Sequence, residues 1–288
     1  MITGVMNFSH LCDGNRRDGR ILKGKYPILI LIPHGGCQIP EELSDLTKLT
    51  PFDLLFESDI CANEIFNFRE KTLSVIDTSI SRLFVDEARS HLDIPPGNED
   101  GVIKSVTSQG REIFPDKVFP DEIALANILK RYYLPFHETA EKILATGTIR
   151  LILECHTMMA VAPPGARDSG RPRPLLTISN RAVADSGNIR TCPEPLARSL
   201  LETMKKSLHD EDTTVAERFT FNKPVFRSYI SEKYGTSQVP LIRIDLSRSL
   251  FFNDRYFSYE YLQVDELRIQ EIRGKIWTGL EKFLSKNF

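Results

Sequence analysis

The chain has 288 residues, of which 41% are hydrophobic and 26% charged, and its formal net charge is −2 at pH 7. This composition is typical of a globular protein with a sizeable core, and its balanced, scattered charges argue against a nucleic-acid-binding surface. No apolar run approaches the roughly 20 residues of a membrane-spanning helix. The five cysteines are widely spaced and follow no secretory leader, so we expect free thiols and a cytoplasmic location.

Apolar and polar segments alternate along the first part of the chain. Residues 1–25 form a polar lead-in, and residues 26–33 are an apolar run typical of a buried strand. Spaced leucines and isoleucines predict a helix over 51–70, and short apolar runs predict strands at 73–76 and 81–85. The pattern is one of strands and helices in alternation.

The same alternation continues to the end of the chain. Helices are predicted over 121–145, where Pro135 should kink or split the helix, from Pro195 to Leu208, and over 260–283. Strands are expected at 151–156, 175–179, 215–219 and 240–246, and long loops at 90–119 and 160–174. This order predicts one three-layer α/β/α domain over residues 26–288, with a mixed, mostly parallel central sheet.

Two histidines lie at the ends of apolar strands. His34 follows the first strand and precedes a glycine pair, which lets the backbone turn sharply and approach another group closely. His156 ends the strand at 151–156. Because parallel α/β sheets place their sites at the carboxyl ends of strands, we expect both imidazoles in one site. Imidazoles with carboxylates suggest a metal-dependent enzyme, and catalytic zinc usually has three protein ligands plus water.

The third ligand has three candidates. Asp59 is our choice, because it begins a helical pattern that would face the strand ends; its simpler interpretation is an ordinary residue at a helix N-terminus. Glu154 shares a strand face with His156, so it is either a ligand or a group that orients that histidine. Cys37, three residues after His34, is a softer candidate ligand. Its simpler interpretation is an inert packing residue.

Charged residues in two other apolar runs suggest catalytic and binding roles. Arg82 and Arg89 flank a strand-like run, and guanidinium groups bind carboxylates at two points or stabilise a developing oxyanion. The alternative is a pair of surface arginines with Asp86 as a partner. Asp245 lies in an apolar run, where burial is costly unless a role such as general base requires it. An ion pair with the neighbouring Arg243 or with Arg248 is the alternative for Asp245.

Six of these segments, in this order, resemble the N-formylglutamate amidohydrolase family of zinc carboxypeptidase-like hydrolases, which is related to aspartoacylase. The likeness spans residues 26–255. Its pieces are Pro33-His34-Gly35-Gly36 with Ile39-Pro40, Ser58-Asp59, Ser81-Arg82 with Val85-Asp86 and Arg89, Glu154-Cys155-His156-Thr157, Tyr229-Ile230 with Tyr234-Gly235, and Ile244-Asp245-Leu246-Ser247-Arg248.

The resemblance implies a fold, an activity and a metal. The fold would be a zinc carboxypeptidase/phosphorylase-hydrolase-like domain with a mixed, eight-stranded sheet between helices. The activity would be cleavage of the linear amide bond of an N-acyl amino acid, with N-formylglutamate as the type substrate. The cofactor would be Zn²⁺ or another divalent metal, and the partner a small acidic molecule rather than a nucleic acid or membrane. The oligomeric state is left open.

The resemblance also implies metal ligands and a base. His34 and His156 match the family's metal histidines, and Asp59 matches the acidic position that we take as third ligand. Asp245 matches the glutamate that acts as general base and is one methylene shorter. Glu154 matches an aspartate that supports the second histidine.

Arginines would complete the catalytic site. Arg82 matches the arginine that polarises the carbonyl group, and Arg89 matches the arginine that binds a substrate carboxylate. Arg227 stands close to another family motif and would help to hold the acidic substrate.

Two departures from the family pattern keep other functions open. The family usually has Asn where this chain has Ala88, and often a glycine pair where this chain has Arg227 and Ser228. A changed pocket is compatible with a related metallopeptidase or amidase that acts on another acidic amide. It is also compatible with a non-catalytic binding protein on the same scaffold.

Overall fold

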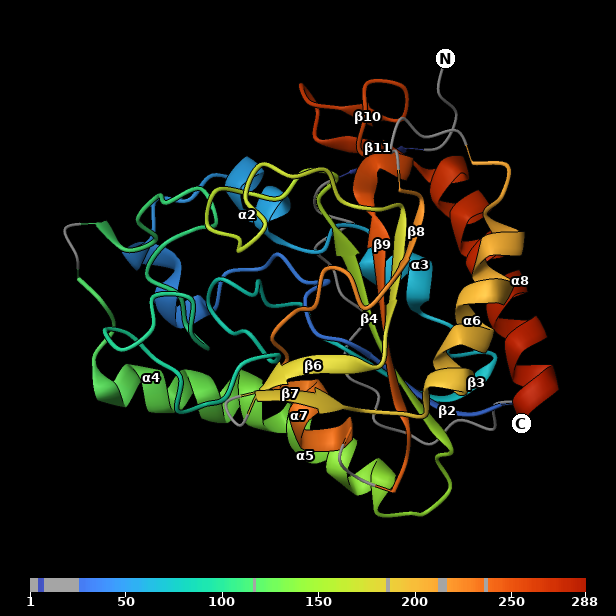
Figure 1. The fold of residues 1–288 in the computed structure, drawn as a ribbon. Helices are drawn as coiled ribbons and strands as arrows, with labels where there is room; N and C mark the ends of the chain where they lie inside the picture. The colour runs from blue at the N-terminus through green and yellow to red at the C-terminus, as the bar shows by residue number, and fades with distance from the viewer. Residues whose placement is uncertain (1–4, 8–25, 116–117, 185–186, 212–216, 236–237) are drawn as a thin grey trace.

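A computed structural model describes residues 5–7, 26–115, 118–184, 187–211, 217–235 and 238–288. Its centre is a six-stranded sheet with the strand order β3-β2-β4-β9-β5-β8 (Figure 1). The strands are β2 (Tyr26–Ile32), β3 (Thr72–Asp77), β4 (Leu151–Met158), β5 (Leu176–Ser179), β8 (Phe219–Phe221) and β9 (Leu241–Ser247). Neighbouring strands are parallel except β5 and β9, which are antiparallel. The predicted mixed, mostly parallel sheet is confirmed, with six strands in its described part instead of eight.

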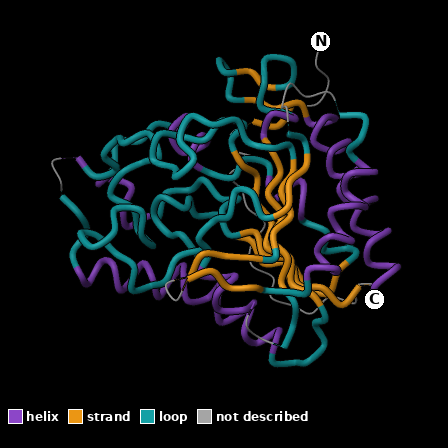
Figure 2. Tube along the Cα trace, in the orientation of Figure 1, coloured by secondary structure: helices purple, strands orange, loops and turns teal. Residues whose placement is uncertain are grey.

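Helices cover both faces of this sheet. On one face lie α3 (Ala62–Phe66), α6 (Glu194–Ser207) and the long C-terminal α8 (Glu266–Asn287). The opposite face holds α5 (Leu134–Leu144), which packs near β3 and continues from α4 (Glu122–Ile128). Figure 2 shows that loops crowd beside the sheet on the side away from α6 and α8. The expected three-layer arrangement is therefore present.

Strand β2 shows why the first apolar run is continuous rather than alternating. Ile28 and Ile30 belong to the core under α3, α6 and α8, whereas Leu29 and Leu31 pack with residues of α5. A strand that is buried on both faces needs apolar side chains at successive positions.

Smaller elements surround the sheet. The strands β1 (Val5–Asn7), β10 (Phe257–Ser258) and β11 (Gln263–Asp265) form a second sheet, and β6 (Arg181–Ala184) pairs with β7 (Gly187–Arg190). The remaining short helical elements are α2 (Pro51–Glu57), α7 (Tyr229–Gly235), η1 (Glu41–Leu46), η3 (Leu129–Tyr133) and η4 (Arg248–Leu250). No helix of the described residues has the length and apolar character needed to cross a bilayer.

Two predictions at the start of the chain were wrong in detail. The helix expected over 51–70 is divided into α2 and α3, because the Asp59 amide donates to the His34 carbonyl at 2.8 Å and diverts the chain. The strand expected at 81–85 is a turn, in which the amides of Phe84 and Val85 donate to the Ser81 carbonyl.

Later segments also differ from expectation. The helix over 121–145 does not split at Pro135; a π-helical turn, η3, precedes this residue and joins α4 to α5. The helix expected to begin at residue 260 begins at Glu266, because residues 263–265 pair as β11. Residues 215 and 216 of the strand expected at 215–219 lie outside the described residues, and β8 begins at Phe219.

A buried histidine outside the sheet makes stability depend on pH. His137 of α5 is 2% exposed; its Nδ1 lies 2.9 Å from the Tyr234 hydroxyl and its Nε2 lies 3.1 Å from the Glu87 carbonyl. Burial, with the nearby Lys233, lowers the pKa of His137 from 6.5 to about 3. The folded state therefore binds fewer protons than the unfolded state, so stability falls as the pH decreases below about 6.5.

Replacing this histidine should remove that loss. We expect His137→Gln to reduce the slope of the unfolding free energy against pH by about 1.4 kcal/mol per unit between pH 6 and pH 4. Urea unfolding at several pH values measures the slope, with the exposed His209→Gln as control. An unchanged slope in His137→Gln would contradict the assignment.

Candidate functional site

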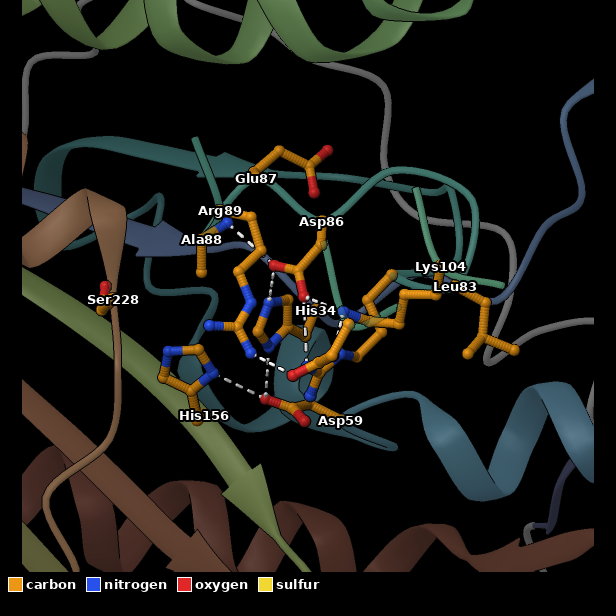
Figure 3. A network of polar contacts seen from close by, with 12 residues as sticks. His34, Asp59, Leu83, Asp86, Glu87, Ala88, Arg89, Lys104, His156 and Ser228 are labelled. Atoms are coloured by element: carbon orange, nitrogen blue, oxygen red, sulfur yellow. Dashed lines mark hydrogen bonds and ion pairs between the residues drawn. The ribbon is translucent and has the colours of Figure 1, made fainter. Parts of the chain in front are cut away.

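Two histidines and a carboxylate meet at the carboxyl edge of the central sheet. His34 follows β2, Asp59 lies between α2 and α3, and His156 lies near the end of β4 (Figure 3). All three are buried, and their potential ligand atoms lie within 4.8 Å of one another. The imidazole centroids are 4.8 Å apart. Residues far apart in the sequence are thus brought to one point, as the strand ends predicted.

The glycines after His34 allow this close approach. A Cβ atom on Gly35 would lie 2.2 Å from the Asn63 Oδ1 atom, and one on Gly36 would lie 2.2 Å from the Ser79 carbonyl carbon. Larger residues would push the turn away from α3 and from the segment after β3. The glycine pair is therefore needed for packing at the place where His34 enters the site.

Both imidazoles present the same nitrogen to the centre. The Nδ1 atoms of His34 and His156 lie 3.6 and 2.8 Å from Oδ2 of Asp59. Their Nε2 atoms instead face two other carboxylates, Asp86 at 2.8 Å and Glu154 at 2.9 Å. Metal-binding histidines commonly hold their second ring nitrogen against a carboxylate in this way. Tetrahedral zinc with ligands at about 2.1 Å requires ligand atoms roughly 3.4 Å apart, so these residues fit a divalent cation.

The electrostatics of the centre favour positive charge between the imidazoles and Asp59. Burial raises the pKa of the Asp59 carboxyl, but the hydrogen bond from His156 and the nearby His34 imidazole outweigh burial and hold that pKa well below its usual value. Burial and Arg243 lower the pKa of His156, but Asp59 and Glu154 outweigh both and raise it. A neutral imidazole donates only one hydrogen bond, whereas both nitrogens of His156 face carboxylates. A cation at Nδ1 would satisfy this arrangement.

Each supporting carboxylate is itself paired with cations. Asp86 contacts Lys104 Nζ at 2.9 Å and Arg82 Nη2 at 3.1 Å. Burial raises the pKa of Asp86, but these cations and His34 outweigh it and keep the pKa well below its usual value. Such pairing is required, because an uncompensated charge in a buried position costs several kcal/mol.

The register of β4 and β9 places a second ion cluster beside His156. Glu154 is opposite Arg243, and His156 is opposite Asp245. Arg243 donates from Nη1 to Glu154 Oε1 at 2.9 Å and from Nε and Nη2 to both oxygens of Asp245 at 2.8 to 3.1 Å. Burial raises the pKa of Glu154, but Arg243, His156 and Ser231 outweigh it and lower the pKa to about 2.

A cavity of about 110 Å³ opens onto this centre. Its lining combines the three candidate ligands with four arginines, two further carboxylates and apolar groups. The ionisable members are His34, Glu57, Asp59, Arg82, His156, Arg173, Arg243, Asp245 and Arg248. A cavity with this lining suits a small ligand with negative charge.

The structure brings only some of the predicted residues to this cavity. Arg82 and Asp245 line it, and Glu154 lies behind His156. Arg89 and Arg227, which the sequence predicts as substrate-binding residues, are not among the residues that line it. Arg89 is ion-paired with Asp100, and Arg227 Nη2 lies 3.6 Å from Asp93.

Sequence reasoning missed two of the lining arginines. Arg173 ends a proline-rich segment that predicts only a loop, and no local signal indicates that it turns inward. The sequence suggests Arg248 only as a partner of Asp245, but this arginine donates to the Phe56 carbonyl at 2.8 Å and to Asp59 Oδ1 at 3.3 Å. The one local signal for Arg248 is its position directly after the apolar run of β9. That position does not predict the direction in which its side chain points.

The cysteines in the described part of the chain divide into two groups, and Cys12 lies outside that part. Cys61, Cys155 and Cys192 are free and buried, as expected. Cys37 is disulfide-bonded, so the expectation of a free thiol was wrong for this residue. A disulfide sulfur is no thiolate donor, and the candidate metal group of the described residues contains no cysteine. Of the alternatives for the third ligand, Asp59 is the one that the described geometry groups with both histidines.

Comparisons with known proteins agree with this fold. The family model for N-formylglutamate amidohydrolase matches residues 26–252, so the chain belongs to that family. The crystal structure of N-formylglutamate amidohydrolase from Ralstonia eutropha aligns with a TM-score of 0.69 and 15% identity, over 94% of this chain and 98% of that one. A gene product of Agrobacterium tumefaciens aligns with a TM-score of 0.61 and 18% identity, over 98% and 94% of the two chains. A search of curated protein sequences found no match.

Metal binding should depend on the residues of the centre. We expect His156→Ala and Asp59→Asn to weaken Zn²⁺ binding at least a hundredfold, because loss of a supporting partner alone typically costs 10- to 100-fold. Metal analysis after dialysis and chelator competition measure this. The exposed His91→Ala is the matched control. Equal metal content in His156→Ala and in the unaltered protein would rule out this centre.

Proposed function

We propose that this protein is a zinc-dependent amidohydrolase that cleaves the amide bond of a small, acidic N-acyl amino acid such as N-formylglutamate. The observation that carries the proposal is the convergence of His34, Asp59 and His156 in an arginine-lined cavity. Family membership supports hydrolysis of a linear amide, since the family is that of N-formylglutamate amidohydrolase. Formate release from N-formylglutamate by the zinc-loaded protein is the direct test.

The two Nδ1 atoms and Asp59 would hold a divalent cation, which would supply Lewis acidity toward a carbonyl oxygen and make water a stronger nucleophile. Asp245 is the proposed general base: its carboxylate lines the same cavity and lies opposite His156 in the sheet. It would take a proton from the attacking water and deliver it to the leaving nitrogen. Arg243 holds both of its oxygens and so fixes the direction of the carboxylate.

Arg82 is the proposed donor to the oxyanion. One of its nitrogens, Nη2, is engaged by Asp86, but within the described part of the chain its buried Nε atom has no hydrogen-bond partner. A donor that is already oriented and lacks a partner can bind negative charge as it develops without first breaking another bond. Asp86 forms an ion pair with Arg82 and also contacts His34 Nε2, so one carboxylate orients both side chains.

Loss of this donor should slow turnover without releasing the metal. We expect Arg82→Ala to lower kcat on the order of a hundredfold, the usual cost of removing one oxyanion donor. Steady-state assays with N-formylglutamate and metal analysis of the same samples measure the two effects. Arg111→Ala, an arginine outside the cavity that pairs with Asp53, is the control. Unchanged turnover in Arg82→Ala would refute the role.

Arg173 is the proposed site for the substrate carboxylate, in place of Arg89 and Arg227. It is 7% exposed, lines the cavity and lies with its guanidinium carbon 5.3 Å from the Phe226 ring centroid. Asp168 accepts from its Nε and Nη2 atoms at 2.9 Å each, which orients the guanidinium plane. A rigid, oriented arginine loses little entropy when it binds a carboxylate.

Removal of this arginine should affect binding more than chemistry. We expect Arg173→Ala to raise KM for N-formylglutamate about 10- to 100-fold with a much smaller change in kcat, because a charged hydrogen bond contributes about 1.5 to 3 kcal/mol. Arg89→Ala tests the alternative predicted from sequence. A larger rise in KM for Arg89→Ala than for Arg173→Ala would reverse the assignment.

A panel of N-acetyl amino acids and short peptides separates a related amidase from the proposed deformylase.

A further inference from the structure

We propose that Ser228 and Ser231 are positioning residues of the metal centre, which hold Glu154 so that it orients His156. This inference rests on the metal site of the proposed function. It concerns two hydroxyl groups that neither touch the cavity nor belong to the candidate ligands. Ser228 is also one of the positions where the sequence departs from the pattern of the family that it resembles.

The two hydroxyls bind the two oxygens of one buried carboxylate. Ser228 Oγ donates to Glu154 Oε1 at 2.7 Å, and Ser231 Oγ donates to Glu154 Oε2 at 2.6 Å. Neither serine is more than 1% exposed, and Glu154 is fully buried. With Arg243 and His156 also on Oε1, the carboxylate is held from several directions. It therefore presents Oε1 to His156 in one orientation.

Local structure explains why these two serines act together. Ser228 lies immediately before α7, and its Oγ atom accepts the amide of Ser231 at 3.1 Å. Residues three apart in the first turn of a helix lie on the same side. The first turn of α7 thus points two hydroxyls at the middle of β4, where Glu154 lies.

The same turn is tied to the support of the other histidine. The Tyr229 amide donates to the Ala88 carbonyl at 2.8 Å, and the Ala88 amide donates to Asp86 Oδ1 at 3.0 Å. Asp86 Oδ1 is also the atom that faces His34 Nε2. Figure 3 shows Ala88 between Asp86 and the Ser228 segment. The start of α7 therefore connects the carboxylates behind both imidazoles.

Loss of either hydroxyl should loosen His156 rather than remove a ligand. A buried carboxylate oxygen that loses its donor is left without that hydrogen bond, so Glu154 gains other orientations. His156 then presents Nδ1 to the cation for a smaller fraction of the time. Partners of this kind typically contribute 10- to 100-fold to metal affinity.

The test is the Zn²⁺ affinity of the metal-free protein, measured by competition with a chelator. We expect Ser231→Ala to weaken binding about tenfold or more and Ser231→Thr, which keeps the hydroxyl, to restore most of it. Ser228→Ala should act in the same direction and, because Ser228 also accepts the Ser231 amide, lower the unfolding midpoint. Ser74→Ala is the matched control, since Ser74 is a buried strand serine whose hydroxyl has no partner in the described part of the chain.

Affinities of Ser231→Ala and Ser228→Ala within twofold of the unaltered protein would overturn the proposal. If Ser228→Ala does not fold, Ser231→Ala decides alone, because the hydroxyl that accepts an amide at the start of α7 is that of Ser228, whereas the Ser231 hydroxyl donates to Glu154. Weakened Zn²⁺ binding in both variants supports the inference even if no amide in the substrate panel is cleaved. In that case the proposed function fails while the positioning role stands. Unchanged metal affinity together with normal formate release would mean that the positioning role fails while the proposed function stands.

Discussion

The contact on which the site depends is the one between the Asp59 carboxylate and the Nδ1 atoms of two imidazoles. Asp59 is 4% exposed, and a carboxylate in such a position must be compensated by nearby cations or hydrogen-bond donors. His34, His156 and Arg248 provide this compensation. Each of these partners in turn requires a fixed position. Many of the surrounding polar contacts hold these partners of Asp59 in place.

Outward from this contact, negative and positive groups alternate. Behind the imidazoles stand Asp86 and Glu154, and behind these carboxylates stand Lys104, Arg82 and Arg243. No single pair is strongly stabilising after desolvation is counted. Because the charges alternate, moving any one of these side chains would leave a buried charge without its counterion, and such an arrangement is unfavourable. Other arrangements of these charged groups are therefore costly, which favours the fixed geometry that a metal site needs.

Several parts of this architecture are predictable from the sequence, for local reasons. The run at β2 is apolar at successive positions because both of its faces are buried. The sequence alone predicts this burial, since a strand with one exposed face would alternate apolar and polar residues. His34 and His156 follow from their places at strand ends in an alternating α/β pattern. The parallel β2–β4 pairing then brings those ends to one edge of the sheet. The overall layers and the two histidines were accessible on these grounds.

Other parts depend on contacts between distant segments. Asp59 was expected at the start of one helix, yet it occupies a break between two helices that the His34 carbonyl creates. The turn at 81–85 has strand-like residues; Ser81 makes an isolated bridge with Gly36, whereas Leu83, Phe84 and Val85 are buried by packing. Arginine raises the same difficulty, because its long side chain reaches whichever carboxylate the fold brings near. Arg89 therefore turns to Asp100 while Arg173, from an unpromising loop, lines the cavity.

By itself, the sequence determined the alternation of buried strands and helices, the positions of the two histidines at strand ends and the family resemblance, because each is a pattern among neighbouring residues. Only the tertiary structure decided which carboxylate joins those histidines, which arginines face the cavity and how α7 reaches Glu154. These are choices among charged partners far apart in the chain. They are settled by the cost of leaving any buried charge uncompensated, a cost that exists only after the segments have packed together.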